Sequence, residues 1–397
     1  MTIQTATNPW QNRGERLGEI SLVLIGFTIP LSNALCTGVF PTLAVVAWLM
    51  LCGWRDVPKL LRENRVALFC VVLFAWLGVA AIYGGGGSEA FGIWKKYREL
   101  ALVVIYMGLA ATLPNRQRAV MALAIGLLVA MQISFMQAAG MLPMKHGHPV
   151  LSSTLTHGAL LAWLSFFLAH YAWKTKLLGV YFLVGLVVVD LFFLVDSSTG
   201  VVLFIALGLL FGCQTLSRTK LIWMLLGLAL LMTAMYGVSP VFRDAIREDA
   251  KTVRVFFDGE ERTWTSTGQR IEFYRNSLAL FGQAPVLGHG TGRFHEKYAE
   301  HVAGTKQVVT SNPHNEYLMV GVQSGLVGLG ILVALLWALW RAASRWEGMD
   351  RWLAQGMVVW LAVGCCFNSF ILDSREGMLF ALLAGVYGAA PTAEKES

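Results

Sequence analysis

The block Val66–Tyr83, VALFCVVLFAWLGVAAIY, decides the kind of fold, because it carries no charged side chain from end to end. A helix that crosses the hydrocarbon core of a bilayer needs about 20 mostly apolar residues, since lipid offers no hydrogen-bond partner to an exposed backbone. Charged residues flank the block at Arg65 and Glu89. The block therefore predicts a transmembrane helix.

Blocks of the same kind recur along the whole chain. Of its 397 residues, 56% are hydrophobic and only 14% are charged, which is typical of a membrane protein. The sequence thus predicts an all-α polytopic membrane protein with about twelve transmembrane helices. The expected spans are Arg16–Ala34, Phe40–Trp54, Val66–Tyr83, Ile93–Leu113, Ala119–Ala139, Thr154–Trp173, Leu177–Val195, Val201–Gln214, Leu221–Val238, Asn315–Trp340, Trp352–Ser369 and Gly377–Ala390.

Lysine and arginine orient these spans, because short loops rich in positive charge stay in the cytoplasm. Alternate loops are rich in Lys and Arg, whereas the loops between them, such as Gly84–Ser88, have almost none. Both termini are then cytoplasmic, and we expect the first span to be an uncleaved anchor after the polar stretch Met1–Glu15. The net charge of +7 follows from this asymmetry, so we expect no nucleic-acid partner. The positive loops are Arg55–Arg65, Asn115–Arg118, Trp173–Lys176, Ser217–Lys220 and Arg341–Arg351.

One polar segment, Ser239–Pro313, is far longer than the other loops and is predicted to be periplasmic. Within it, Thr267–Phe281 has apolar residues at helical spacing and is expected to form a short amphipathic helix. Phe242–Arg262 mixes acidic and basic residues and is expected to form a solvated helix. The chain then divides into nine spans in residues 1–238, this loop, and three further spans with a cytoplasmic tail in residues 314–397.

The stretch SNPHNEYL, Ser311–Leu318, closes the large loop and opens the tenth span. Ser311 or Asn312 is expected to cap the helix, and Pro313 suits its first position. His314 would then lie in the first turn, where the helix dipole favours a neutral ring. A neutral histidine can accept a proton from a hydroxyl group. The alternative is an interfacial polar residue that merely completes the cap.

Three cationic residues lie on the predicted outer side of the membrane, where the rule that keeps Lys and Arg in cytoplasmic loops predicts few. Lys95, Lys96 and Arg98 begin the fourth span on the outer side, and Glu99 would lie one helical turn below Lys95. Keeping these charges at the membrane suggests an anionic ligand, although long cationic side chains also reach lipid headgroups. Arg270, in the loop helix, is a further candidate, because guanidinium binds phosphate through two parallel hydrogen bonds.

Gly288–Gly292, GHGTG, precedes Arg293 and forms either a turn that brings backbone amides to a phosphate or, as we favour, a simple loop. No Asp-x-Asp pair, by which many lipid-linked sugar transferases hold a divalent cation, occurs in the chain, and the six cysteines show no zinc or disulfide spacing. The sequence therefore predicts neither a metal nor a cofactor, and assigns charge neutralisation to Arg and Lys.

Two groups of residues resemble the O-antigen ligase and polymerase superfamily. The first is His314-Asn315-x-x-Leu318 after a long outer loop, followed by QSGLVG at Gln323–Gly328. The resemblance extends upstream over Gly268-Gln269-Arg270, Tyr274 and APVLGHG at Ala284–Gly290. It is strong over about Ser266–Leu329, and the rest of the chain shares only the layout of spans with the large loop between the ninth and tenth.

The resemblance implies a GT-C-like glycosyltransferase architecture in the bacterial inner membrane, with the site facing the periplasm. It implies metal-independent, inverting transfer of O-antigen polysaccharide from undecaprenyl diphosphate to a sugar hydroxyl of the lipid A core. The partners would be this donor, this acceptor and membrane lipids. The expected site comprises catalytic His314 and Arg270, donor-binding Lys95, Lys96, Arg98 and Arg293, and supporting Asn315 and Tyr274.

The sequence departs from the family pattern at one place. Related members often carry a Ser-Arg pair at the periplasmic end of the seventh span, whereas this chain has DSSTG at Asp196–Gly200 and lacks the arginine. Three alternatives stay open: an O-antigen polymerase, an oligosaccharyltransferase that modifies protein serine, and a transporter of the lipid-linked glycan. The transporter would place charged residues inside the spans, whereas here they lie at the ends of the spans.

Overall fold

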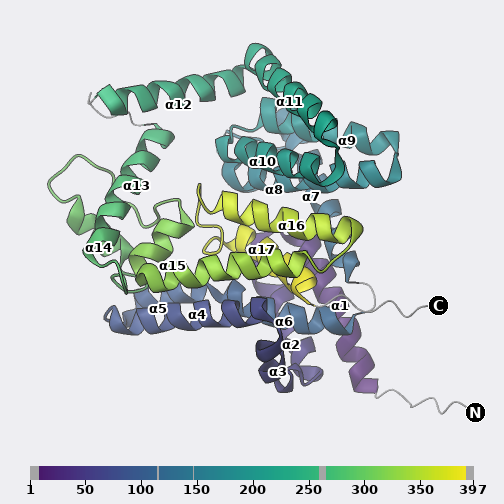
Figure 1. Cartoon of the computed structure of the whole chain (residues 1–397), viewed down its shortest axis with the longest axis vertical. Coiled ribbons are helices and arrows are strands. Elements are labelled where there is room, and N and C mark those ends of the chain that lie inside the picture. The colour runs from purple at the N-terminus through teal and green to yellow at the C-terminus, as the bar shows by residue number, and fades with distance from the viewer. Residues whose placement is uncertain (1–8, 114–115, 146, 259–264, 390–397) are drawn as a thin grey trace, which may run out of the picture.

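The computed structural model describes residues 9–113, 116–145, 147–258 and 265–389 as helices joined by turns (Figure 1). Within these ranges the structure contains no strand, only an isolated bridge between Lys145 and His148. The all-α part of the expected fold class is therefore confirmed. The predicted cytoplasmic tail from residue 390 onward, residues 1–8 of the N-terminal stretch and residues 259–262 of the predicted solvated helix lie outside the described residues.

The helices follow the predicted blocks closely. In chain order they are α1 Pro9–Thr28, η1 Leu35–Val39, α2 Phe40–Met50, η2 Gly53–Arg55, α3 Val57–Glu63, α4 Arg65–Tyr83, α5 Gly87–Lys96, α6 Arg98–Thr112, α7 Gln117–Ala138, α8 Thr154–Thr175, α9 Leu178–Val189, η3 Asp190–Leu194, α10 Ser198–Thr215, α11 Arg218–Val238, α12 Pro240–Asp258, α13 Ser266–Gln283, α14 Phe294–His301, α15 Glu316–Ala343, α16 Gly348–Gly364 and α17 Ser374–Gly388.

Five of the described helices, α4, α7, α10, α11 and α15, are long and apolar enough to cross a membrane. Two shorter apolar segments, Leu35–Met50 and Leu178–Leu194, fall at predicted spans. These helices support a membrane protein, whereas the number of twelve spans and the side on which each loop lies stay predictions. The predicted loop segment contains α12, α13 and α14, and α13 confirms the helix expected at Thr267–Phe281.

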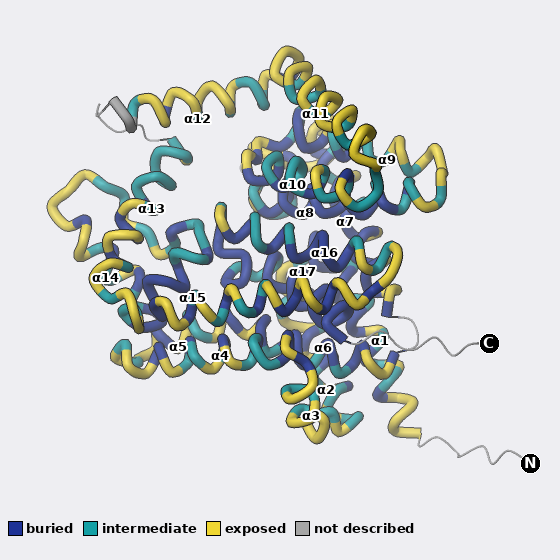
Figure 2. The backbone as a smooth tube through the Cα atoms, viewed as in Figure 1, coloured by how far each residue is buried: buried dark blue, intermediate teal, exposed yellow. Residues whose placement is uncertain are grey.

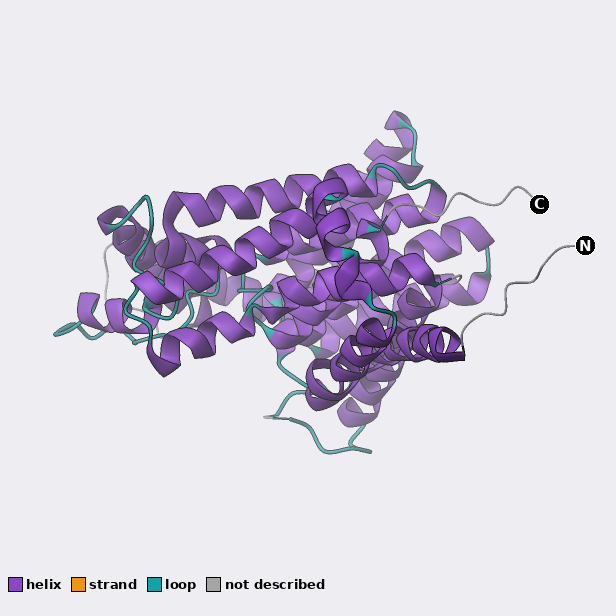
Figure 3. Ribbon diagram, turned by 90° about the horizontal axis from the view of Figure 1, so that it is seen from below, coloured by secondary structure: helices purple, strands orange, loops and turns teal. Residues whose placement is uncertain are grey.

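The core of the bundle surrounds α17, which is buried at every residue from Glu376 to Gly388. Helix α8 is buried over most of its length, and both helices lie among neighbours in Figure 2. Helix α11 is the opposite case, because it is apolar and has no buried residue. An apolar helix that packs against little protein is suited to contact with lipid. Seen from below, many of the helices run alongside one another (Figure 3).

Two predicted spans have different boundaries in the structure. The expected span Ile93–Leu113 is broken at Tyr97, which separates α5 from α6, and the buried hydroxyl of this tyrosine donates to the Glu316 carboxylate at 3.2 Å. The expected span Trp352–Ser369 ends as a helix at Gly364, and residues 365–373 form a turn before α17. Each break places polar residues next to the start of α15.

Helix α15 is itself interrupted at Gly325, where φ is 65° and ψ is −161°. The segment Ala284–Gly292 packs against this break, and the amide of Leu326 donates to Pro285 O at 2.8 Å. A Cβ atom on Gly325 would lie 2.2 Å from the carbonyl oxygen of Val286. The close approach of two backbones therefore explains the glycine at this position.

Replacing Gly325 by alanine should strongly destabilise the protein, because only glycine readily adopts this backbone region and the added Cβ overlaps Val286. Strain of this kind costs about 1–3 kcal/mol. The unfolding midpoint in detergent should fall for Gly325→Ala. Gly330→Ala in the same helix is the matched control, since open space surrounds its Cβ. Equal midpoints for the two variants would contradict this account of the break.

Candidate functional site

His314 lies in a turn before α15, not in the first turn of the helix as predicted. Its φ is 54°, and Asn315 is the N-cap, whose side chain accepts a hydrogen bond from Leu318 N at 3.0 Å. Asn312 does not cap the helix, because its Oδ1 accepts from His314 N and from Ser369 Oγ, both at 2.8 Å. The helix dipole is therefore not what sets the state of the ring.

A hydrogen-bonded chain from the C-terminal turn orients the imidazole of His314. Its Nδ1 lies 3.0 Å from Asn368 Oδ1, and Asn368 Nδ2 donates to Asp373 Oδ2. A carboxylate only accepts hydrogen bonds, so the Asn368 amide must turn its NH₂ group to Asp373 and its oxygen to His314. Nδ1 then donates to Asn368 Oδ1, and Nε2 lies outside these hydrogen bonds. We call residues 314, 368 and 373 the relay.

Asp373 connects this relay to one of the predicted cations. Burial raises the pKa of the Asp373 carboxyl group, while the hydrogen bond from Asn368 and the charges of His314 and Lys96 lower it. Lys96 is thus close enough to act on Asp373 electrostatically, although it comes from the last turn of α5.

Helix α13 covers the other side of the turn. The hydroxyl of Tyr274 lies within hydrogen-bond distance of His314 O, at 3.1 Å, and of Cys366 O, at 2.8 Å. The Phe273 ring stacks on the imidazole of His314 with centroids 6.2 Å apart. Tyr274 therefore ties the His314 turn to the C-terminal turn.

Arg270 lies one helical turn before Tyr274 on α13. Burial raises the pKa of Tyr274, and the charge of Arg270 lowers it, so the guanidinium is near the phenol. Arg270 is half-buried, and it has no acidic partner in the part of the chain that the structure describes. Its positive charge is accordingly available for an anionic ligand.

The other predicted cations differ in what they contact. Arg98 pairs with Glu99 at 3.7 Å, so Glu99 neutralises Arg98 and not Lys95 as expected. Arg293 pairs with Glu296 at 2.6 Å. Lys95 and Lys96 are exposed, with no acidic partner within salt-bridge distance among the described residues. Of the predicted donor-binding residues, Lys96 is the one whose charge acts on the pKa of Asp373.

The glycine-rich turn before Arg293 is a structural loop. The amides of His289 and Gly290 donate to Val322 O and Gln323 O of α15 at 2.8 and 2.9 Å. The amide of Gly292 donates to the side chain of Gln323 at 3.0 Å. These amides are occupied, which confirms the favoured interpretation of GHGTG as a loop rather than a phosphate cradle.

Glu316 holds the C-terminal turn in place. Its buried carboxylate accepts hydrogen bonds from Ile371 N at 2.9 Å and Leu372 N at 3.2 Å through Oε2, and from the Tyr97 hydroxyl at 3.2 Å through Oε1. The backbone amide of Glu316 donates to Cys365 O at 2.8 Å. Both ends of the turn are thereby fixed to the start of α15.

Sequence reasoning missed Glu316, Asn368 and Asp373 as parts of this site. Glu316 and Asp373 are ionisable and lie in or beside apolar helices, and intramembrane ionisable residues are by default candidates for function, whereas Asn368 carries no such signal. That signal could have selected the two ionisable residues individually. Across the described residues no three His, Cys, Asp or Glu side chains cluster as metal ligands would.

Comparison with known proteins covers part of the chain. The sequence profile of the family described as O-antigen ligase matches residues 183–333. An uncharacterized protein from Haemophilus influenzae is 32% identical over 76 residues, which is 18% of this chain and 19% of that protein. The chain thus aligns with less than a fifth of this relative's length. The family match includes His314 and Arg270 and ends before the C-terminal turn.

Removing the Glu316 carboxylate should destabilise the protein where the C-terminal turn packs against the start of α15. Glu316→Ala leaves two buried amides and a buried hydroxyl without their acceptor, each at a cost of about 1–3 kcal/mol. The unfolding midpoint should fall markedly for Glu316→Ala and less for Glu316→Gln, which keeps one accepting oxygen. Glu300→Ala on exposed α14 serves as control and should leave the midpoint unchanged. An unchanged midpoint for Glu316→Ala would show that this carboxylate does not hold the turn.

Proposed function

We propose that the chain is a member of the O-antigen ligase superfamily, whose sequence profile matches residues 183–333, and that it acts as the ligase of that superfamily. It would transfer O-antigen polysaccharide from undecaprenyl diphosphate to a sugar hydroxyl of the lipid A core. The reaction is inverting and independent of metal, and takes place on the periplasmic face of the bacterial inner membrane. The observation that carries the proposal is the relay, which orients His314 with Nε2 outside its hydrogen bonds, while the charges of Arg270 and Lys96 act on Tyr274 and Asp373 of the same site.

His314 is proposed as the general base. The acceptor oxygen attacks the anomeric carbon of the donor, and the proton of the hydroxyl moves to Nε2 of His314. The bond from that carbon to the diphosphate oxygen breaks and leaves its electron pair on the diphosphate. Because attack comes from the face opposite the leaving group, the anomeric configuration inverts. General-base assistance of this kind contributes about 10²- to 10⁴-fold to a rate.

Arg270 and Lys96 are proposed to hold the diphosphate and stabilise its developing charge. Both lie on elements that contact the His314 turn or its relay, and Arg270 has no acidic partner among the described residues. Lys95 supplies further positive charge. Arg98 and Arg293, each paired with a neighbouring carboxylate, would bind the donor more weakly, because that pairing offsets their charge.

Asn315 and Tyr274 are proposed to support the base without taking part in the chemistry. Asn315 caps α15 through its oxygen, and its Nδ2 donates to Cys366 O at 3.0 Å. Tyr274 spans the carbonyl oxygens of His314 and Cys366. Together these side chains fix the position of Nε2 relative to the cations on α13 and α5.

His314→Ala should abolish transfer. The assay combines purified protein, undecaprenyl-diphosphate-linked O-antigen and lipid A core in detergent with a chelator, and reads the lipopolysaccharide ladder. The wild type should form the ladder, and His314→Ala should lose it because no base accepts the hydroxyl proton. Arg270→Ala should reduce the rate by about 10²- to 10³-fold. Arg275→Ala, on an exposed position of the same helix, is the matched control.

The same assay separates the alternatives. Longer undecaprenyl-linked glycan without modified lipid A core would identify a polymerase, and glycan on a protein serine would identify an oligosaccharyltransferase. Movement of donor across a vesicle membrane without a new glycosidic bond would identify a transporter. If the wild type formed the ladder only when the chelator was left out, this result would contradict the metal-independent route.

The relay should affect turnover more than substrate binding. Asp373→Asn replaces a group that only accepts hydrogen bonds by an amide that can present either its oxygen or its NH₂ group. The Asn368 amide is then no longer held in one orientation, and the proton on Nδ1 of His314 can lose its partner. We expect kcat to fall by about tenfold or more, with little change in KM for either substrate. Tyr317→Phe is the control, since it deletes a nearby hydrogen bond to Ala362 O that lies outside the relay. Equal effects on kcat from both substitutions would mean that the relay only stabilises the fold.

A further inference from the structure

Gln323 joins two segments of the protein that are far apart in sequence. It lies on α15 two residues before the break at Gly325, and its side chain is fully buried. Its Oε1 accepts a hydrogen bond from Gly292 N at 3.0 Å, and its Nε2 donates to the Tyr97 hydroxyl at 3.3 Å. Its backbone oxygen accepts from Gly290 N at 2.9 Å. This one residue thus connects the glycine-rich loop before α14 to the break between α5 and α6.

The donors and acceptors in this connection fix one another's direction. A backbone N–H only donates, so Gly292 turns the oxygen of the Gln323 side chain toward itself and leaves the NH₂ group to Tyr97 and to Met319 O, at 3.3 Å each. The Tyr97 hydroxyl accepts from Gln323, and its own proton goes to Glu316 Oε1 at 3.2 Å. We call residues 292, 323, 97 and 316 the buried network.

Three cations of the proposed donor site are next to members of the buried network in the chain. The cations are Lys96 and Arg98, on either side of Tyr97, and Arg293, directly after Gly292. At its other end the network reaches Glu316, two residues after His314. Because a side chain extends from the backbone that carries it, the network fixes where these cations and the base begin.

The glycine-rich loop is held from a second side by α4. Thr291 Oγ1 donates to Leu77 O at 2.7 Å, and the amide of Thr291 donates to Ala80 O at 3.2 Å. A Cβ atom on Gly290 would lie 2.3 Å from the Cα atom of Gly84, so the two backbones are in direct contact. The loop therefore cannot shift without losing hydrogen bonds to both α4 and α15.

A directed chain of polar groups supplies what apolar packing does not. Burying polar groups costs free energy unless each one is paired, and a fully paired network makes the core rigid and unique. The proposed reaction needs such rigidity, because the diphosphate leaves as the acceptor oxygen attacks. A misplacement of about 1 Å can reduce the rate of a reaction by about 10²-fold.

We propose that Tyr97 and Gln323 are positioning residues, which hold the adjoining cations of the donor site in a fixed place relative to His314. The inference rests on the proposed function and specifies how the protein places the donor diphosphate relative to the base. Neither side chain touches a substrate in this role. Loss of either should raise KM for the donor and leave KM for the acceptor unchanged.

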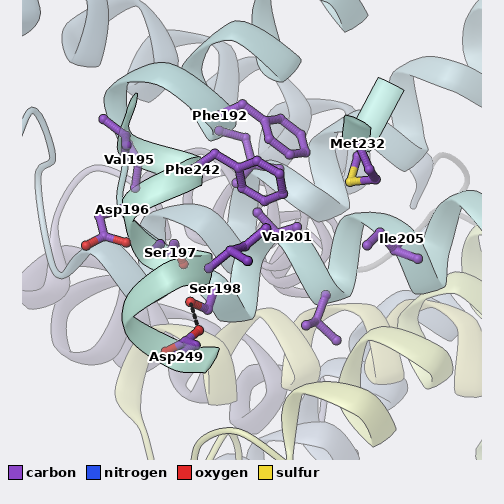
Figure 4. Close-up of a pocket in the computed structure, with 15 residues that line it drawn as sticks. Phe192, Val195, Asp196, Ser197, Ser198, Val201, Ile205, Met232, Phe242 and Asp249 are labelled. Carbon is purple, nitrogen blue, oxygen red and sulfur yellow. Dashed lines mark hydrogen bonds between the residues drawn. The ribbon is translucent and has the colours of Figure 1, made fainter. Parts of the chain in front are cut away.

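An apolar pocket of about 340 Å³ lies between η3, α10, α11 and α12, and none of its lining residues belongs to the buried network. Phe192, Phe242 and Val201 lie along it (Figure 4). Pockets of this size hold small molecules or part of a lipid. Contacts of an isoprenoid chain with such apolar surfaces would not depend on the network, so a test of the network has to separate the diphosphate from the chain.

Equilibrium binding of two probes to the full-length protein in detergent makes this separation. Undecaprenyl diphosphate carries the chain and the diphosphate, whereas undecaprenol carries the chain alone. Tyr97→Phe should weaken binding of undecaprenyl diphosphate about tenfold, the factor that loss of one hydrogen bond to a charged group produces, and leave undecaprenol binding unchanged. Tyr106→Phe on α6 is the matched control, since this tyrosine is equally buried and its hydroxyl has no hydrogen-bond partner among the described residues.

A double-mutant cycle tests whether the two residues act as one unit. Gln323→Leu should weaken undecaprenyl diphosphate binding by a factor similar to that of Tyr97→Phe, and the double variant should bind little more weakly than either single variant. Independent effects would multiply to about a hundredfold in the double variant and would contradict a single network.

A destabilised variant elsewhere in the bundle separates positioning from stability. Trp360→Phe removes a buried hydrogen bond to Ala159 O, and binding is measured below the lowest unfolding midpoint of the set. Trp360→Phe should leave binding of both probes unchanged. The inference is overturned if Trp360→Phe weakens undecaprenyl diphosphate binding as much as Tyr97→Phe does, or if Tyr97→Phe weakens binding of both probes equally.

The outcomes also separate this inference from the proposed function. If the wild type forms no ladder but Tyr97→Phe selectively weakens binding of undecaprenyl diphosphate, the ligase assignment is wrong and the positioning role stands. If the ladder forms but Tyr97→Phe and Gln323→Leu bind undecaprenyl diphosphate as tightly as the wild type, the ligase assignment stands and the positioning role is wrong.

Discussion

The buried carboxylate of Glu316 is the constraint on which the site depends. Its oxygens accept hydrogen bonds from two backbone amides of the turn between α16 and α17, and from the hydroxyl of Tyr97 at the α5–α6 break. A carboxylate this deeply buried is stable only when its lone pairs are satisfied, so these segments must meet. The meeting point places Asn368 beside His314, although the two are 54 residues apart in the chain.

The polar groups around Glu316 differ in whether their hydrogen bonds and charges have partners within the protein. Glu316 has all its hydrogen bonds within the protein, so it contributes structure, whereas His314 keeps one ring nitrogen unengaged by the relay. Arg98 and Arg293 have carboxylate partners, whereas Arg270 and Lys96 have none within salt-bridge distance in the described part of the chain. A reaction that needs a base and positive charge can use groups that the described protein does not engage in hydrogen bonds or salt bridges. Here these groups lie around the His314 turn.

The sequence by itself determined the helical membrane fold and most helix positions, and it singled out His314 and Arg270 as candidates, because apolar block length and local motifs are read over a few consecutive residues. It wrongly placed His314 in the first turn of the helix after a cap at Ser311 or Asn312, whereas Asn315 caps α15 and His314 precedes the helix. Only the tertiary structure revealed Asn368, Asp373 and the break at Tyr97. Those features arise from hydrogen bonds between segments distant in sequence, and no local pattern encodes which buried acceptor a distant donor will meet.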